Sequence, residues 1–104
     1  MTATRSITMW AAGTLRVTAE TTVDGTVRIS GQDFGHPLFE EYEYWITVWS
    51  GDVAALVAAL GGVDGDDVLE LLGQQAEEIV RKGEKTWLED HGIVPGFSNR
   101  MGDP

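Results

Sequence analysis

The stretch Glu41-Tyr-Glu-Tyr-Trp-Ile-Thr-Val-Trp49 alternates between two sets of side chains, and a different rhythm follows it over residues 53–60. A period of two in residues that favour extended backbone predicts a β-strand. In the later segment Val53, Leu56, Val57 and Leu60 recur at the spacing of one face of an amphipathic helix. The chain therefore changes from strands to helices near residue 50.

Three segments before this change also alternate, over residues 5–10, 14–20 and 26–30. Asp24-Gly25 is typical of a tight hairpin turn because both residues tolerate positive φ. The longest loop, residues 31–38, contains two glycines and a proline. We therefore predict four strands within residues 1–49.

The segment after residue 50 predicts three helices within residues 51–92. Ser50 is the expected N-cap of the first helix, and Gly61-Gly62 ends it. The second is expected to start near residues 64–67 and to end near Gly83, and the third covers about residues 84–91. Residues 93–97 are expected to dock as an extension, and residues 98–104 to form a loose tail.

These elements fit one domain, residues 1–104, with the C-terminal extension at 93–104. The predicted fold class is α+β: a four-stranded antiparallel β-meander followed by three helices packed on one face.

Charge is the most informative feature of the composition. The 104 residues hold seventeen Asp and Glu against seven Lys and Arg, for a formal net charge of −10, and no Cys. Such a chain repels phosphate backbones and anionic lipids, so nucleic acid and membranes are disfavoured as partners and a basic protein is favoured. Without Cys there is no disulfide, thiolate metal site or thiol nucleophile. No apolar run is long enough to span a bilayer, and we expect a cytoplasmic protein.

The acidic residues are concentrated in one part of the chain. Residues 29–80 contain no Lys or Arg. They contain eleven carboxylates, which are Asp33, Glu40, Glu41, Glu43, Asp52, Asp64, Asp66, Asp67, Glu70, Glu77 and Glu78.

The fourth predicted strand separates two faces of different chemistry. One face carries Tyr42, Tyr44, Ile46 and Val48, and we expect the helices to cover it. The other face is then open, and the remaining strands would add Thr8, Trp10, Arg16, Thr18, Arg28, Ser30 and Gln32 to it. Tryptophan is enriched at binding hot spots, and carboxylates attract a basic partner. The candidate partner-binding residues are Glu41, Glu43, Trp45, Thr47, Trp49 and Trp10.

Two other interpretations of this strand stay open. Arg16 and Arg28 can pair across strands with Glu41 and Glu43 in a purely structural role. Alternatively the register is reversed, so that the Trp side chains form the core and the Tyr side chains face outward.

Asp64-Gly-Asp-Asp67 and Glu70 gather four carboxylates and invite comparison with a calcium loop. An EF-hand needs Gly at position 6, which here is Leu69. Because acidic residues are favoured at helix starts, we interpret the group as a helix N-terminus and expect no bound metal.

Signals for catalysis are weak. His36 lies near Asp33 in the long loop, and the pair defines the alternative hypothesis, a small enzyme or ligand-binding domain. His91 ends the third predicted helix, where an imidazolium stabilises the helix dipole. No metalloprotease, nucleophile-elbow or phosphate-loop motif is present, so we predict a non-enzymatic protein without a cofactor.

The stretches Ser30-Gly-Gln-Asp-Phe-Gly35, Glu41-Tyr-Glu-Tyr-Trp-Ile-Thr-Val48 and Gly92-Ile-Val-Pro-Gly-Phe97 resemble small proteins of high-GC bacteria. The overall layout resembles the immunity proteins of bacterial toxin systems, which are small, acidic, cytoplasmic and non-enzymatic. Those proteins share no defining motif, so the resemblance assigns no residue roles. It implies an inhibitor that binds and neutralises a basic protein toxin, such as a nuclease. We expect it to act as a monomer or weak homodimer.

Overall fold

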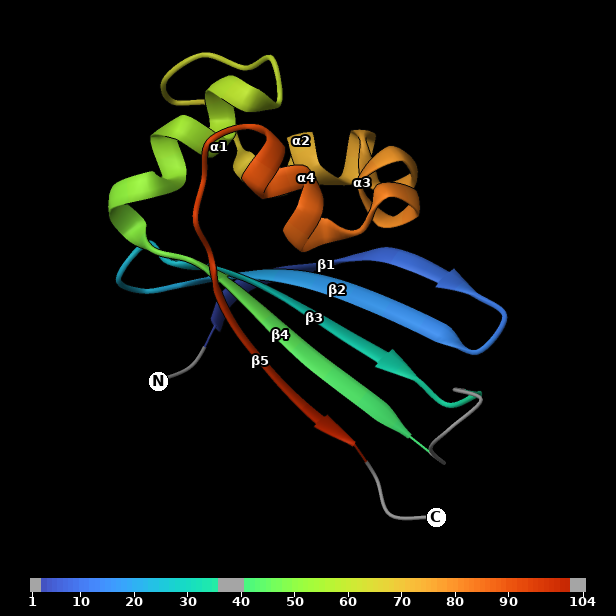
Figure 1. Cartoon of the computed structure of the whole chain (residues 1–104). Helices are drawn as coiled ribbons and strands as arrows, with labels where there is room; N and C mark the ends of the chain where they lie inside the picture. The colour runs from blue at the N-terminus through green and yellow to red at the C-terminus, as the bar shows by residue number, and fades with distance from the viewer. Residues whose placement is uncertain (1–2, 36–40, 102–104) are drawn as a thin grey trace.

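Five antiparallel strands form one sheet in the computed structural model, which describes residues 3–35 and 41–101 (Figure 1). Each strand pairs with its neighbour in chain order, which confirms the predicted meander. The strands are β1 (Ala3–Ala12), β2 (Leu15–Thr22), β3 (Val27–Asp33), β4 (Tyr42–Val48) and β5 (Gly96–Met101).

β5 corrects the expected loose tail, because the chain returns after the helices and pairs with the outer edge of β4. Ile46 faces Phe97 and Glu43 faces Arg100 across this pair. The segment has no alternating apolar pattern, so it becomes a strand by using the unpaired backbone groups of β4 rather than by its own propensity. Residues 102–104 of the expected tail lie outside the described residues.

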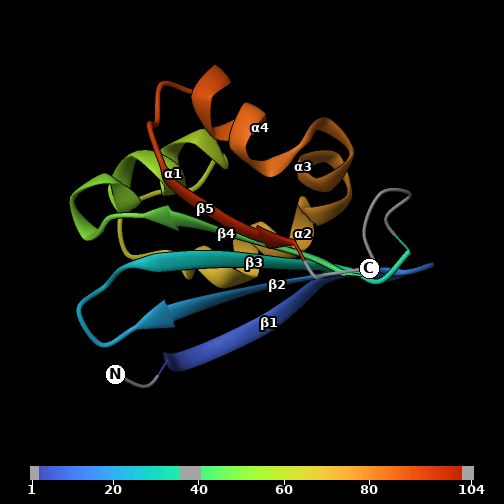
Figure 2. The same cartoon turned by 60° about the horizontal axis from the view of Figure 1, so that its bottom comes forward.

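All the helices lie on one face of the sheet (Figures 1 and 2). They are the short 3-10 turn η1 (Ser50–Asp52) and the helices α1 (Val53–Ala59), α2 (Val68–Gln74), α3 (Ala76–Lys82) and α4 (Glu84–Asp90). α2 and α3 pack over β1, and α2 also contacts β2. No helix in the described part of the chain is long and apolar enough to cross a membrane.

The second predicted helix is in fact two helices, α2 and α3, which are separated at Gln75. The side-chain amide of Gln75 donates a hydrogen bond to the carbonyl oxygen of Leu60 at 2.6 Å, and this residue leaves helical backbone geometry at ψ 15°. The break turns α3 away from α2 while Leu72 and Ile79 stay buried on either side of it. A tertiary contact therefore overrides the continuous helical pattern.

Most of the predicted helix ends are confirmed. The Asp67 carboxylate caps α2 by accepting hydrogen bonds from the N–H groups of Leu69, at 3.0 Å, and Glu70, at 3.4 Å. Gly83, with φ 97°, ends α3. The expected cap Ser50 is wrong, because Ser50 lies within η1 and Asp52 occupies the N-cap position of α1 without a side-chain hydrogen bond.

The core lies between the helices and the inner face of the sheet. Ile46 and Val48 are 1% and 0% exposed, which confirms that the face with Tyr42 and Tyr44 is the covered one and excludes the reversed register. From the other elements, Val17, Ala19, Val27, Ile29, Leu56, Leu69, Leu72, Ile79, Trp87 and Leu88 complete the core.

Candidate functional site

The sheet face away from the helices, here called the open face, carries no helix in the described structure (Figure 2). Register places Thr18, Ser30 and Trp45 side by side across its middle. Trp45 is half-buried and lines a hollow of about 250 Å³ with Glu43, Arg16 and other polar residues. The structure therefore brings Glu43, Trp45 and Thr47 onto the open face, as predicted.

Trp49 lies directly after β4 and is 57% exposed. It lines a second hollow, of about 330 Å³, together with Thr47, Arg28 and Val23. Glu41 lies directly before β4 and is half-buried. Of the predicted binding residues, Glu43, Trp45, Thr47 and Trp49 thus share one side of the molecule.

The placement of Trp10 on the open face is wrong. The register of β1 against β2 shifts between Thr8, which faces Thr18, and Trp10, which faces Val17. The extra residue in this β-bulge leaves Met9 and Trp10 both opposite Val17, whose side chain is in the core. Trp10 accordingly packs against the core on the helix side.

The open face is close to balanced in charge, although the protein as a whole is acidic. Its strands present Arg16, Arg28 and Arg100 against Glu20 and Glu43. In the alternative interpretation Arg28 pairs with Glu41 or Glu43, but its ion-pair partner is Glu20, whose Oε1 lies 3.9 Å from Arg28 Nη1. The excess carboxylates therefore lie elsewhere.

The helical layer, residues 50–90, carries the negative charge. It contains ten Asp and Glu against three Lys and Arg. Its three basic residues are all in ion pairs, namely Arg81 with Glu77 at 3.2 Å, Lys82 with Asp90 at 2.6 Å and Lys85 with Glu89 at 2.8 Å. The carboxylates that form no ion pair with a described Lys or Arg are Asp52, Asp64, Asp66, Glu70, Glu78 and Glu84.

Of the carboxylates of residues 64–70, Asp67 takes the predicted place at the start of α2, and Glu70 lies in its first turn. Asp67 is the N-cap and also pairs with Arg5 of β1, and Asp66 accepts a hydrogen bond from the N–H of Val63 at 2.8 Å. The Arg5 hydrogen bond lowers the pKa of Asp67, with help from the cap N–H groups. Within residues 3–35 and 41–101, no group of three or more His, Asp or Glu is arranged to hold a metal ion.

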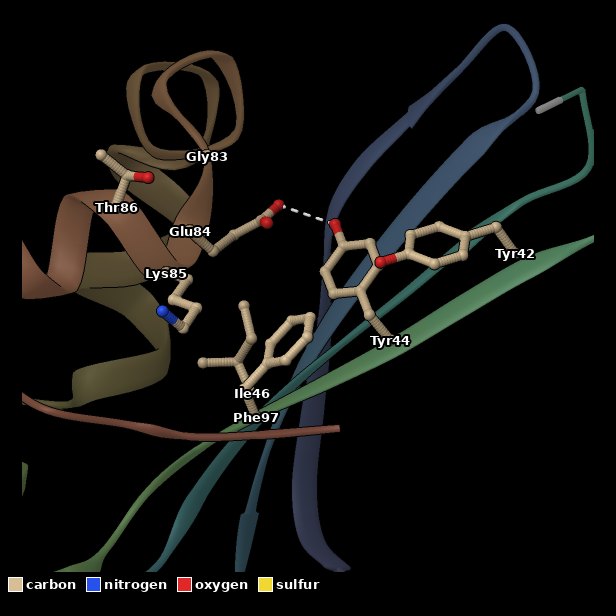
Figure 3. A pocket seen from close by; sticks show the side chains of 8 residues that line it. All are labelled: Tyr42, Tyr44, Ile46, Gly83, Glu84, Lys85, Thr86 and Phe97. Carbon is tan, nitrogen blue, oxygen red and sulfur yellow. Dashed lines mark hydrogen bonds between the residues drawn. The ribbon is translucent and has the colours of Figure 1, made fainter. Parts of the chain in front are cut away.

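A third pocket, which sequence reasoning missed, lies between β4, β5 and the start of α4 (Figure 3). The Tyr44 hydroxyl donates a hydrogen bond to Glu84 Oε1 at 2.9 Å. Tyr42, Phe97 and Lys85 also line this cavity of about 250 Å³. Glu84 is 6% exposed and is the one buried charged residue in the described chain. No local pattern connects Tyr44 with a residue forty positions later.

The environment of this pocket shifts the pKa of both partners. Burial raises the pKa of the Glu84 carboxyl. Burial, together with the nearby Glu84 charge, raises the pKa of the Tyr44 hydroxyl well above its usual range, so Tyr44 stays a hydrogen-bond donor. We call this cavity the Tyr44–Glu84 pocket.

Gly31 leaves room for the Tyr44 ring because it has no side chain. The two residues face each other across β3 and β4, and a Cβ at Gly31 would lie 2.1 Å from Tyr44 Cζ. The bare glycine therefore lets the ring lie against β3 and point its hydroxyl toward α4.

The candidate pair Asp33 and His36 is only half described. Asp33 Oδ1 accepts hydrogen bonds from Thr14 Oγ1 at 2.8 Å and from the N–H of Gly35 at 3.0 Å, which holds the chain as it leaves β3. His36 lies outside the described residues. His91 directly follows α4, with Nδ1 2.7 Å from the Trp87 carbonyl oxygen, in the helix-end position expected for it.

No protein-family model matches this chain, and comparisons with curated proteins and with solved structures also find no match. The functional argument therefore rests on the geometry and charge described above.

Proposed function

We propose that this protein is a non-enzymatic immunity protein that neutralises a basic protein toxin, such as a nuclease, by binding it directly. The observation that carries the proposal is the helical layer, with ten carboxylates against three basic residues. A nuclease needs a positive surface to hold phosphate, and a negative surface of this kind both attracts it and competes for that surface.

Charge favours the helical layer over the open face as the side that attracts the partner. Asp52, Asp64 and Glu70 are exposed and form no ion pair with a described cation. The open face, with its balanced charge and half-buried Trp45, offers a second contact surface of a different kind. A tryptophan there would contribute to affinity by being buried against the partner rather than by charge.

The direct test is to express each gene adjacent to the one that encodes this chain, with and without this protein. One of those products is expected to be a basic protein that stops growth when alone and is harmless in the presence of this chain. The purified pair should form a stoichiometric complex. If a neighbouring product is toxic and is not neutralised, or if none is toxic, the immunity function is wrong.

Two matched variants then locate the binding surface. Asp52→Asn, Asp64→Asn and Glu70→Gln together should slow association with the partner about tenfold, because they remove the steering charge. Arg16→Gln, Arg28→Gln and Arg100→Gln together should not slow it, because they make the protein more acidic. Equal association rates for the two triple variants would contradict a docking role for the helical layer.

Trp45→Ala tests the open face. Because the side chain is only half-buried, its loss should cost under about 1.5 kcal/mol in the free energy of unfolding. It should cost about 2 kcal/mol or more in partner affinity if the open face is a contact surface. Urea unfolding and calorimetric titration measure the two quantities. Unchanged affinity for the partner would remove the open face from the interface.

A further inference from the structure

Glu84 is a buried anion without a cationic partner in the described chain. It is 6% exposed, and none of the ion pairs of residues 3–35 and 41–101 includes it. Its stabilising contacts are hydrogen bonds from the Tyr44 hydroxyl and from its own backbone N–H. Burying a carboxylate costs free energy that such neutral donors offset only in part. The Tyr44–Glu84 pocket is therefore complementary to a positive charge.

Aromatic rings form the other walls of the pocket. The ring centroids of Tyr42 and Tyr44 are 5.8 Å apart with planes tilted by 34°, and Phe97 of β5 is 45% exposed beside them. Aromatic faces attract ammonium groups, and their carbons pack along aliphatic chains. Aromatic walls around a carboxylate are the chemistry of an organic-cation site (Figure 3).

Size and hydrogen bonding favour a lysine side chain as the occupant. The cavity, about 250 Å³, is smaller than the roughly 300–1,000 Å³ typical of small-molecule sites. Arginine prefers both oxygens of a carboxylate, and Glu84 Oε1 already accepts the Tyr44 hydroxyl. A compact ammonium needs only one oxygen.

The protein's own lysine at this pocket is paired elsewhere. Lys85 lies on the α4 side of the cavity (Figure 3). Its Nζ donates a hydrogen bond to Glu89 Oε2 at 2.8 Å. The charges of Lys85 and Glu89 offset each other, which leaves the Glu84 charge to the cavity.

We propose that the Tyr44–Glu84 pocket binds a lysine side chain of the basic protein partner, with Glu84 as counter-ion and Tyr42, Tyr44 and Phe97 around the alkyl stem. The source of the lysine rests on the proposed function, whereas the cation chemistry of the pocket rests on the residues themselves.

The test uses two probes that differ in one charged group, N-acetyl-lysine methylamide and N-acetyl-norleucine methylamide. Each is titrated into the whole protein while backbone amide signals are followed by NMR. The lysine probe should give saturable shifts at residues 83–86 and at Phe97, with a Kd at least about tenfold lower than that of the norleucine probe. Equal binding of both probes, or no saturable shift at these residues, would overturn the proposal.

Variants separate a binding role from a structural one. Glu84→Gln keeps an acceptor for Tyr44 and should retain the native amide spectrum while losing the preference for lysine. Phe97→Ala, at an exposed edge position, should also weaken lysine binding. Glu77→Gln removes the same charge at an exposed position outside the pocket and should bind lysine like the natural protein. If Glu84→Gln is folded and still prefers lysine, the pocket is purely structural.

The two proposals fail in different ways. The lysine probe needs no partner, so the pocket can be refuted while neutralisation of a toxin still holds. Conversely, lysine binding in the pocket without any neutralised neighbouring product would refute the immunity function and leave the cation site standing.

Discussion

Tyr44 connects the sheet to the helices through two close contacts of its side chain. Its ring lies where Gly31 has no side chain, and its hydroxyl reaches the one buried carboxylate of the described chain. These two contacts, one steric and one electrostatic, give separate predictions at the scale of the residue.

Gly31→Ala should destabilise the protein by about 2–3 kcal/mol, because the added Cβ would lie 2.1 Å from Tyr44 Cζ. The same substitution in a Tyr44→Ala background should cost much less, since the ring is gone. Urea unfolding of the four proteins in this double-mutant cycle measures the difference. An equal cost in both backgrounds would mean that the ring does not occupy the space beside Gly31.

Glu84→Gln should raise stability at neutral pH relative to the natural protein. The pKa of Glu84 is higher in the folded protein than in the unfolded chain. The folded state therefore loses stability as the pH rises from the unfolded pKa to the folded one, and the whole loss is present above the folded pKa. Glutamine does not ionise. The gain from the substitution should therefore shrink as the pH falls toward about 3, below the unfolded carboxyl pKa of roughly 4.3. Urea unfolding across this range is the measurement, and a gain that does not change with pH would contradict the burial of Glu84.

At the scale of the element, strand pairing and helix ends determine the local structure more than the intrinsic propensities of the residues do. The bulge at Met9 inverts the side of the sheet on which Trp10 lies, and Gln75 divides one helical pattern into α2 and α3. α2 spans only seven residues, a length that is not stable as an isolated helix, so its cap and its packing must hold it.

Asp67→Ala should cost about 1 kcal/mol in the free energy of unfolding, because α2 loses its N-cap. Asp64→Ala, an exposed change in the same loop, should stay within about 0.5 kcal/mol. The pKa of Asp67 is lowered in the folded state, so its contribution is present above the unfolded pKa and is lost as pH falls through the folded value. Thermal melts at neutral and acid pH should show the gap between Asp67→Ala and the natural protein closing. A gap that persists in acid would show that neither the cap nor the pair with Arg5 depends on the charge of Asp67.

At the scale of the whole molecule, the two sides of the protein differ in charge. The helical layer holds most of the carboxylate excess, and the open face is nearly balanced. A formal net charge of −10 on 104 residues should therefore act as a directed field that orients a basic partner before contact.

Association with the basic partner should slow markedly between about 50 and 500 mM salt, because the Debye length falls from roughly 14 Å to 4 Å. Dissociation should change much less, because it depends on short-range contacts. Stopped-flow or surface-binding kinetics at several salt concentrations measure both rates. An association rate that does not depend on salt would remove the electrostatic argument for a basic partner.

The sequence by itself determined the features that depend on near neighbours. Alternation over residues 42–48 put Tyr44 and Trp45 on opposite faces of the strand, and the residues that end or start helices located Asp67 and Gly83 correctly. These signals are local, since each needs only the few residues around it to set a backbone angle or satisfy a backbone group.

Only the tertiary structure decided which distant groups meet. β5 exists because β4 offers it an edge, and Trp10 changes sides because one residue of β1 has no counterpart in β2. The pairing of Tyr44 with Glu84, and the separation of an acidic helical layer from a balanced open face, arise when segments far apart in the chain are packed together. Such contacts depend on packing and pairing over the whole chain, and no periodicity within one segment encodes them.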